Sequence, residues 1–94
     1  LDAISDEDAS ILHEPYTWTI KQVVGHLIDV ERVFSYRALR FACGDLRPIL
    51  GMEQNDWIDN CDYVSPSLKS LVDELEYCRR GNVCLIKRLI RKTH

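Results

Sequence analysis

The stretch WTIKQVVGHLIDVERVFSYRALRFACGD, residues 18–45, decides the fold because one run carries a helix start, a long apolar stripe and a helix end. Thr19 followed three residues later by Gln22 is the pattern of a capping box, in which each side chain accepts a hydrogen bond from the other residue's backbone N–H. Gly44 is the expected C-terminal stop. Between them, apolar residues recur at the spacing of an amphipathic helix, at Ile20, Val23, Val24, Leu27, Ile28, Phe34, Ala38, Phe41 and Ala42.

Two polar residues of this predicted helix need partners. His26 lies beside the apolar stripe, so we expect its ring to point into a flank of the core rather than into open water. Glu31 falls in the middle of the apolar arc, where a carboxylate requires a cation or several hydrogen-bond donors. Arg37 or Arg40 is the expected partner of Glu31, in a structural ion pair within the helix or across to a neighbour.

A second long helix is predicted from Ser65 as N-cap and Pro66 as the first helical residue. Its apolar stripe continues to Leu89, and we expect it to stay continuous through Gly81. Residues 53–60 could form a short helix that carries Trp57 and Ile58 inward. Because no segment alternates as a half-buried strand does, the sequence predicts an all-α protein with two long helices and a short connecting helix.

The bulk properties describe a single domain over residues 1–94, 46% hydrophobic and 29% charged, as in soluble globular proteins. A net charge of -3 argues against nucleic acid as a partner, and no apolar run is long enough to suggest a membrane partner. The four cysteines lack metal-site or disulfide-scaffold spacing, so we expect free thiols and a cytoplasmic location. The basic residues Lys87, Arg88, Arg91 and Lys92 lie where cations complement the end of a helix dipole.

Several separated motifs agree in order with one known family. The sequence reads Trp18-Thr19-Ile20-Lys21, then Gly25-His26-Leu27-Ile28-Asp29 and Glu31-Arg32, then residues 36–42 and Gly44-Asp45. In this order they resemble the DinB-like superfamily, which includes the YfiT-type proteins. The resemblance continues less sharply over residues 51–57 and 67–90. It implies a DinB-like four-helix bundle, of which the first helix and a later H-x-x-x-H helix have no counterpart here, so the domain is expected to be partial.

The resemblance also implies a divalent metal, usually zinc or nickel, held by one histidine of the G-H-L helix and two of the H-x-x-x-H motif. His26 matches the first ligand, and the remaining histidines are His13 and His94. Asp29, one turn from His26, could orient its ring, and Glu53 or Asp56 could approach it after folding. The implied activity is that of a metal-dependent hydrolase or a thiol S-transferase, acting on a small-molecule thiol or an electrophile. The catalytic residues are unknown.

Two alternatives stay open at this stage. His26 is either a metal ligand or a hydrogen-bonded core histidine. The protein is either a metal-dependent enzyme or a non-catalytic helical dimerisation module that has lost the metal site. Two helices cannot cover the broad apolar arc of the first one, so a four-helix bundle must be completed by missing segments or by a second copy. We expect a homodimer.

Overall fold

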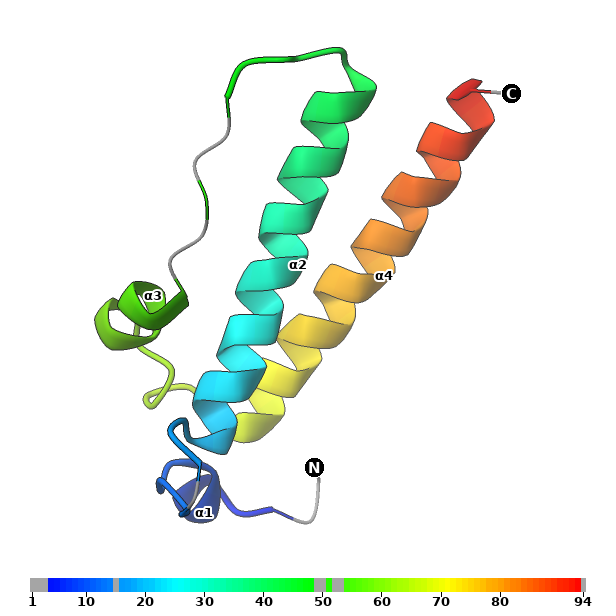
Figure 1. Ribbon diagram of the computed structural model, residues 1–94. Coiled ribbons are helices and arrows are strands. Elements are labelled where there is room, and N and C mark those ends of the chain that lie inside the picture. Colours follow the sequence, from blue (N-terminus) through cyan, green and yellow to red (C-terminus); the bar gives the residue numbers. More distant parts are fainter. Residues whose placement is uncertain (1–3, 15, 49–50, 52–53, 94) are drawn as a thin grey trace.

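The computed structural model describes residues 4–14, 16–48, 51 and 54–93, and over these residues the chain is helical without strands, as predicted. Four helices follow in order: α1 (Asp6–Ala9), α2 (Ile20–Ala42), α3 (Gln54–Asn60) and α4 (Leu68–Thr93). The two long helices and the short connecting helix are confirmed, and α1 is an additional element (Figure 1). Among the described residues, no helix is both long and apolar enough to cross a membrane.

The boundaries of α2 are those that the sequence predicts. Thr19 Oγ1 accepts a hydrogen bond from the Gln22 backbone N–H at 3.1 Å, and Gln22 Oε1 accepts one from the Thr19 backbone N–H at 2.8 Å. At the other end Gly44 has a φ of 72°, a left-handed conformation that glycine adopts without strain. Both ends are set by contacts between near neighbours in the sequence.

The start of α4 differs from the prediction by two residues. Asp62 Oδ1 accepts hydrogen bonds from the backbone N–H groups of Val64 and Ser65, each at 3.0 Å, and holds Ser65 in a turn before the helix. Ser67 caps the helix instead, with its Oγ accepting from the Ser70 backbone N–H at 3.1 Å. The helix then continues through Gly81 without interruption, as predicted.

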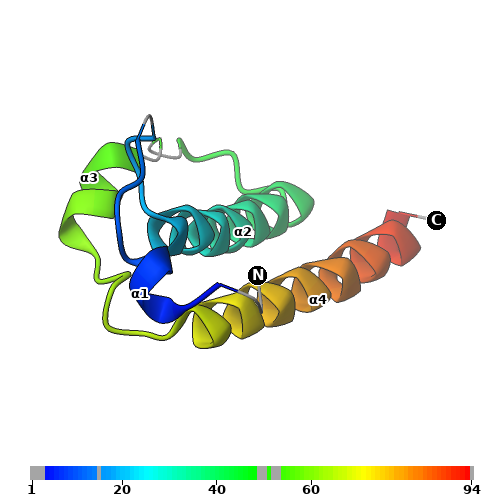
Figure 2. The same cartoon turned by 90° about the horizontal axis from the view of Figure 1, so that it is seen from below.

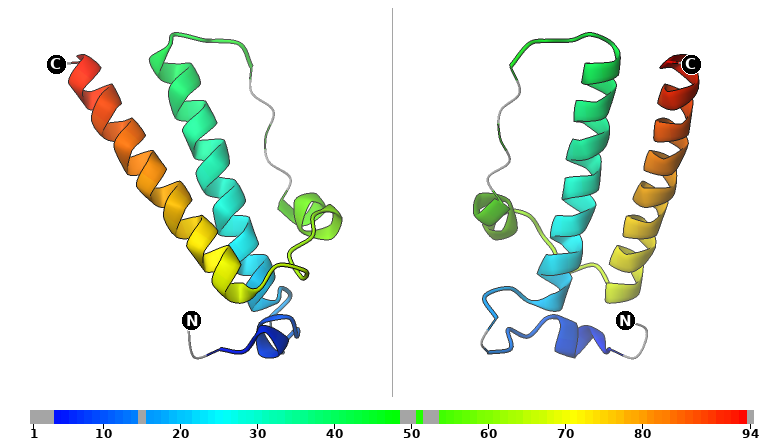
Figure 3. Two further views of the ribbon diagram at one scale, coloured as in Figure 1. Left: turned by 180° about the vertical axis from the view of Figure 1, so that it is seen from behind. Right: turned by 45° about the vertical axis from the view of Figure 1, so that its right-hand side comes forward.

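The two long helices lie side by side and run in the same direction, with both N-terminal ends near α1 (Figures 1 and 2). The connection after α2 passes through α3 and returns to the α1 end, where α4 begins (Figure 3). The helices diverge toward their C-terminal ends. The core therefore gathers at the α1 end, where the buried cluster consists of Ala9, Val24, Ile28, Leu68 and Leu71.

Much of the apolar stripe of α2 is left uncovered by this arrangement. Val24 and Ile28 are buried, but Val23, Leu27 and Phe34 remain exposed, although all five belong to the predicted stripe. The helices that contact α2, namely α1, α3 and α4, cover only part of its circumference. These exposed apolar side chains leave one side of α2 open.

Candidate functional site

His26 lies half-buried on α2, on the flank of the core where the sequence places it. Its ring meets the Trp18 ring edge to face, with 5.0 Å between ring centroids and an interplanar angle of 68°. The Nδ1 atom is buried and forms no hydrogen bond with a described residue. The simple hydrogen-bonded core histidine therefore does not account for this nitrogen.

Of the residues proposed beside His26, those that the structure describes do not form a ligand set with it. Among the described residues, no group of three or more His, Cys, Asp or Glu side chains is placed to hold a metal ion. Asp56 is exposed on α3, and His13 Nε2 lies 3.1 Å from the backbone oxygen of Asp8. Glu53 and His94 lie outside the described residues. The described donor set does not fit a divalent metal by itself, because protein metal sites with one histidine need further ligands at bonding distance.

Asp29, expected beside His26, takes part in a different contact. Its carboxylate accepts a hydrogen bond from the Tyr63 hydroxyl, and burial together with this carboxylate raises the pKa of Tyr63 above its usual value. Gly25 leaves room for the Tyr63 ring, since a Cβ there would lie 1.8 Å from Tyr63 Cδ1. Lys21 Nζ donates to the Val64 backbone oxygen at 2.9 Å. Lys21, Gly25 and Asp29 thus form a face of α2 that anchors the segment before α4.

Glu31 is paired with α4 rather than with its own helix. Arg79 Nε donates to Glu31 Oε1 at 3.1 Å, and Asn82 Nδ2 donates to Glu31 Oε2 at 2.5 Å and to the Glu31 backbone oxygen at 3.1 Å. The predicted partner Arg40 instead pairs with Asp45 at 3.2 Å, and the predicted structural ion pair is made across to the neighbouring helix. We name Glu31, Arg79 and Asn82 the polar triad.

The polar triad lies in a groove between α2 and α4. The groove has a volume of about 450 Å³, and its walls are Val30, Glu31, Phe34, Arg79, Asn82, Val83 and Ile86. Its apolar members come from both helices, and Phe34 and Val83 keep 45% and 51% of their surface exposed. Two further depressions lie elsewhere along the long helices. One, of about 660 Å³, continues along α4 and shares Arg79 and Val83 with the groove.

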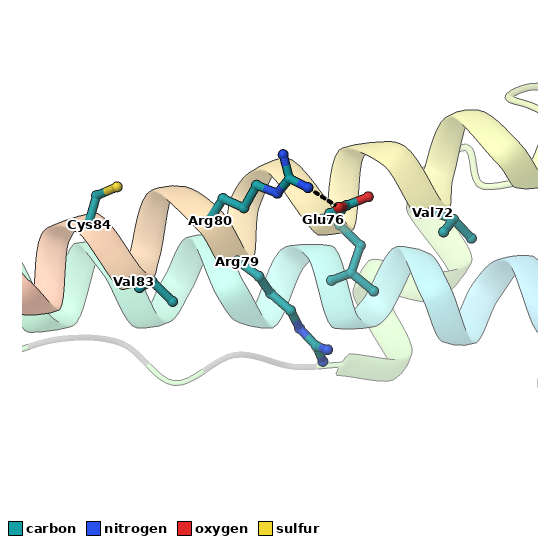
Figure 4. Close-up of a pocket in the computed structure, with 7 residues that line it drawn as sticks. Val72, Glu76, Arg79, Arg80, Val83 and Cys84 are labelled. Atoms are coloured by element: carbon teal, nitrogen blue, oxygen red, sulfur yellow. Dashed lines mark hydrogen bonds and ion pairs between the residues drawn. The ribbon is translucent and has the colours of Figure 1, made fainter.

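Figure 4 shows how this second depression is built. Arg79 points toward α2, where its partner Glu31 lies, while Arg80 turns to the other side and pairs with Glu76 at 2.5 Å. Val72 and Val83 supply apolar wall on either side of these charged side chains. The third depression, also about 660 Å³, extends the apolar side of α2 toward the α1 end, lined by His13, Tyr16, Thr17, Trp18, Ile20, Val23, Val24 and Leu27.

The three depressions leave open, mainly apolar surface on both long helices. Such a surface, with a polar group at its centre and no covering element among the described residues, is typical of an interface with another helix or helix pair. The sequence correctly placed Glu31 in the apolar arc of α2, but it did not identify Arg79 and Asn82 as the partners of Glu31. A signal for Asn82 was present, because an asparagine inside the apolar stripe of a helix needs a polar partner.

A family model described as the DinB superfamily matches residues 1–92, which confirms the resemblance carried by the G-H-L helix. No curated protein and no solved structure matches the chain significantly.

Proposed function

This chain belongs to the DinB superfamily, and on that premise we propose that it is a helical association module that pairs with a second copy of itself to complete a four-helix bundle. The observation that carries the proposal is the open groove between α2 and α4, lined by exposed apolar side chains of both helices. In water such a continuous apolar surface is costly, and its burial favours association.

A second copy suits this groove because of the number of helices. One chain supplies two long helices, α2 and α4, with their apolar sides turned to the same groove. Two copies supply four, the number that closes a bundle around a common core. In a two-fold dimer the same surface is used by both copies, so a single self-complementary groove is sufficient.

The polar triad is compatible with burial in that interface. Glu31 already has a cation and an amide as partners within its own chain, and its side chain is largely covered. Burying a charge whose partners are in place avoids the large penalty of an unpaired buried charge. Polar groups at one position of an apolar interface also favour a single register over shifted alternatives.

Serine substitutions on the groove test the homodimer. Phe34→Ser and Ile86→Ser each remove an apolar wall from α2 or α4, and each dimer loses two such side chains. Because one buried apolar side chain contributes about 1.5–3 kcal/mol, we expect the dissociation constant of the dimer to rise about 10-fold or more. Sedimentation equilibrium measures this constant.

The matched control is Phe41→Ser, which changes a phenylalanine on α2 that is 83% exposed and does not line the groove. Its dissociation constant should equal that of the unaltered protein. If Phe34→Ser and Phe41→Ser behave alike, the groove is not the interface.

Divalent-metal binding at His26 is a second candidate function, and two observations favour it. The chain belongs to the DinB superfamily, and the buried Nδ1 atom of His26 has no hydrogen-bond partner among the described residues. A zinc or nickel ion bound there would supply Lewis acidity to a hydrolase or a thiol S-transferase acting on a small-molecule thiol or an electrophile. Among the described residues, His26 has no group of further ligands that would complete such a site.

A further inference from the structure

The two ends of the molecule carry opposite charge, and this polarity bears on how two copies are oriented. We propose that the copies pair antiparallel, with the α1 end of each against the C-terminal end of α4 of the other. This inference rests on the proposed homodimer and specifies the geometry of its partner.

The acidic end is α1. Asp6, Glu7 and Asp8 form its first turn, and all three are exposed. Glu7 and Asp8 form no ion pair with another described residue. This end of the chain therefore presents a cluster of three carboxylates beneath the N-terminal ends of α2 and α4 (Figure 1).

The basic end is formed by the last turns of α4. Lys87, Arg88 and Arg91 are exposed there, and in the part of the chain that the structure describes none of them forms an ion pair. The molecule is 47 Å long, and α1 and the C-terminal end of α4 lie at its opposite ends (Figure 3). Since this separation is several times the Debye length of about 8 Å at physiological salt, the two clusters cannot neutralise each other within one chain.

Helix dipoles explain only part of this charge distribution. Because α2 and α4 are parallel, their positive ends lie together near α1 and their negative ends lie together at the other end. Asp6 interacts with the positive end of α4 directly, because its Oδ1 accepts a hydrogen bond from the Leu68 backbone N–H at 2.7 Å. Each helix end carries only about half a charge. At each end of the molecule, the dipoles of α2 and α4 together therefore offset about one of the three formal side-chain charges. Opposite net charge remains at the two ends.

Antiparallel pairing brings these remaining charges together twice in each dimer. Parallel pairing would instead place basic end beside basic end and acidic end beside acidic end, which is unfavourable. Antiparallel pairing also opposes the summed dipoles of the two helix pairs. The polar triad is consistent with it, because Glu31 and Arg79 lie near the middle of α2 and α4, so a perpendicular two-fold axis places the triad of one copy opposite that of the other.

Charge reversal distinguishes the two orientations. The triple variant Lys87→Glu, Arg88→Glu, Arg91→Glu gives an antiparallel dimer two like-charged contacts, and we expect its dissociation constant to rise about 10-fold or more in low salt. A parallel dimer would change little, because its like ends would remain alike. Adding Glu7→Lys and Asp8→Lys to the same chain exchanges the charges of the two ends and should restore antiparallel pairing, while Asp6 still accepts the hydrogen bond from the Leu68 backbone N–H. Sedimentation equilibrium measures all three proteins.

A measurement without substitutions completes the test. Carbodiimide cross-linking of the unaltered protein, mixed from ¹⁴N- and ¹⁵N-labelled chains, should join Lys87 to Glu7 or Asp8 in mixed-isotope peptides, because these residues are too far apart within one chain. A dimer that gives no such peptide, or whose dissociation constant is unchanged by the triple variant, overturns the antiparallel arrangement and leaves the homodimer standing. A monomer overturns both.

Discussion

Gly25 and His26 are adjacent on α2 but face different neighbours, because successive residues of a helix point about 100° apart. Gly25 faces the Tyr63 ring and His26 faces the Trp18 ring. The sequence indicates that His26 lies beside the core, since helix periodicity alone fixes that. It does not indicate Tyr63, because the approach of a loop to a helix depends on the path of the intervening chain.

Replacing Gly25 with alanine should destabilise the protein. The added Cβ would lie 1.8 Å from Tyr63 Cδ1, so the ring must move and its hydrogen bond to Asp29 is disturbed. Overpacking of this kind costs about 1–3 kcal/mol, which exceeds the gain in helix propensity of roughly 1 kcal/mol. Urea unfolding measures the difference.

Gly81→Ala is the matched control, because nothing lies within 4 Å of a Cβ at that helical position. Helix propensity alone should then stabilise the protein by about 0.5–1 kcal/mol. Equal effects of the two substitutions would contradict the close packing of Tyr63 on Gly25.

His26→Ala tests the second candidate function. If His26 is a ligand, the protein purified without added metal contains a stoichiometric divalent ion, and the variant loses it while its helical circular dichroism is unchanged. Since Nδ1 has no described hydrogen-bond partner, the substitution in a metal-free protein removes the buried area of the ring and the Trp18 contact, which contributes about 0.5–1.5 kcal/mol beyond that area. Equal metal content in both proteins, measured by elemental analysis, removes His26 as a ligand.

At the scale of elements, helix ends were predictable where the signals are local. The capping box and Gly44 bound α2 as expected, since each involves residues within one turn. The predicted start of α4 was wrong by two residues. Asp62 accepts a hydrogen bond from the Ser65 backbone N–H and holds Ser65 in a turn, and the Ser67 hydroxyl caps the helix instead. Where two serines compete for a cap, the preceding turn decides.

Thr19→Ala should lower the free energy of unfolding by about 1 kcal/mol, because it removes the oxygen that accepts from the Gln22 backbone N–H. Thr17→Ala is the control, since Thr17 is exposed and precedes the helix. Urea unfolding of both variants measures the difference. Equal stability of the two would show that α2 does not depend on this cap.

Asp45, which follows α2, should make the free energy of unfolding depend on pH in the acidic range. Arg47 and Arg40 hold the pKa of Asp45 far below its usual value, chiefly through hydrogen bonds from their side chains. A lowered pKa contributes stability above about pH 4 that is lost as the pH falls further, because the unfolded state then binds more protons. Asp45→Asn should therefore be less stable at pH 7 and lose less stability on acidification. Identical pH profiles of the two proteins would contradict this role of Asp45.

For the whole molecule, the all-α architecture was predictable but the groove was only partly so. The apolar arc of α2 is broader than the single apolar stripe of α4. The sequence therefore indicated that a further element must cover the rest of this arc. The partners of Glu31 could not be derived from the sequence, since Arg79 and Asn82 are 48 and 51 residues away and meet it only through the packing of α4 on α2. Arg40 was the wrong choice because it pairs with Asp45 and lies about 13.5 Å along α2 from Glu31.

If two copies complete the bundle, the mass of the unaltered protein in solution is that of a dimer. Sedimentation velocity at micromolar concentration should give one compact species with twice the 10.9 kDa mass of the chain. A compact, folded species of 10.9 kDa at the same concentration would contradict the account, because the apolar side of α2 and α4 would then be stable in water.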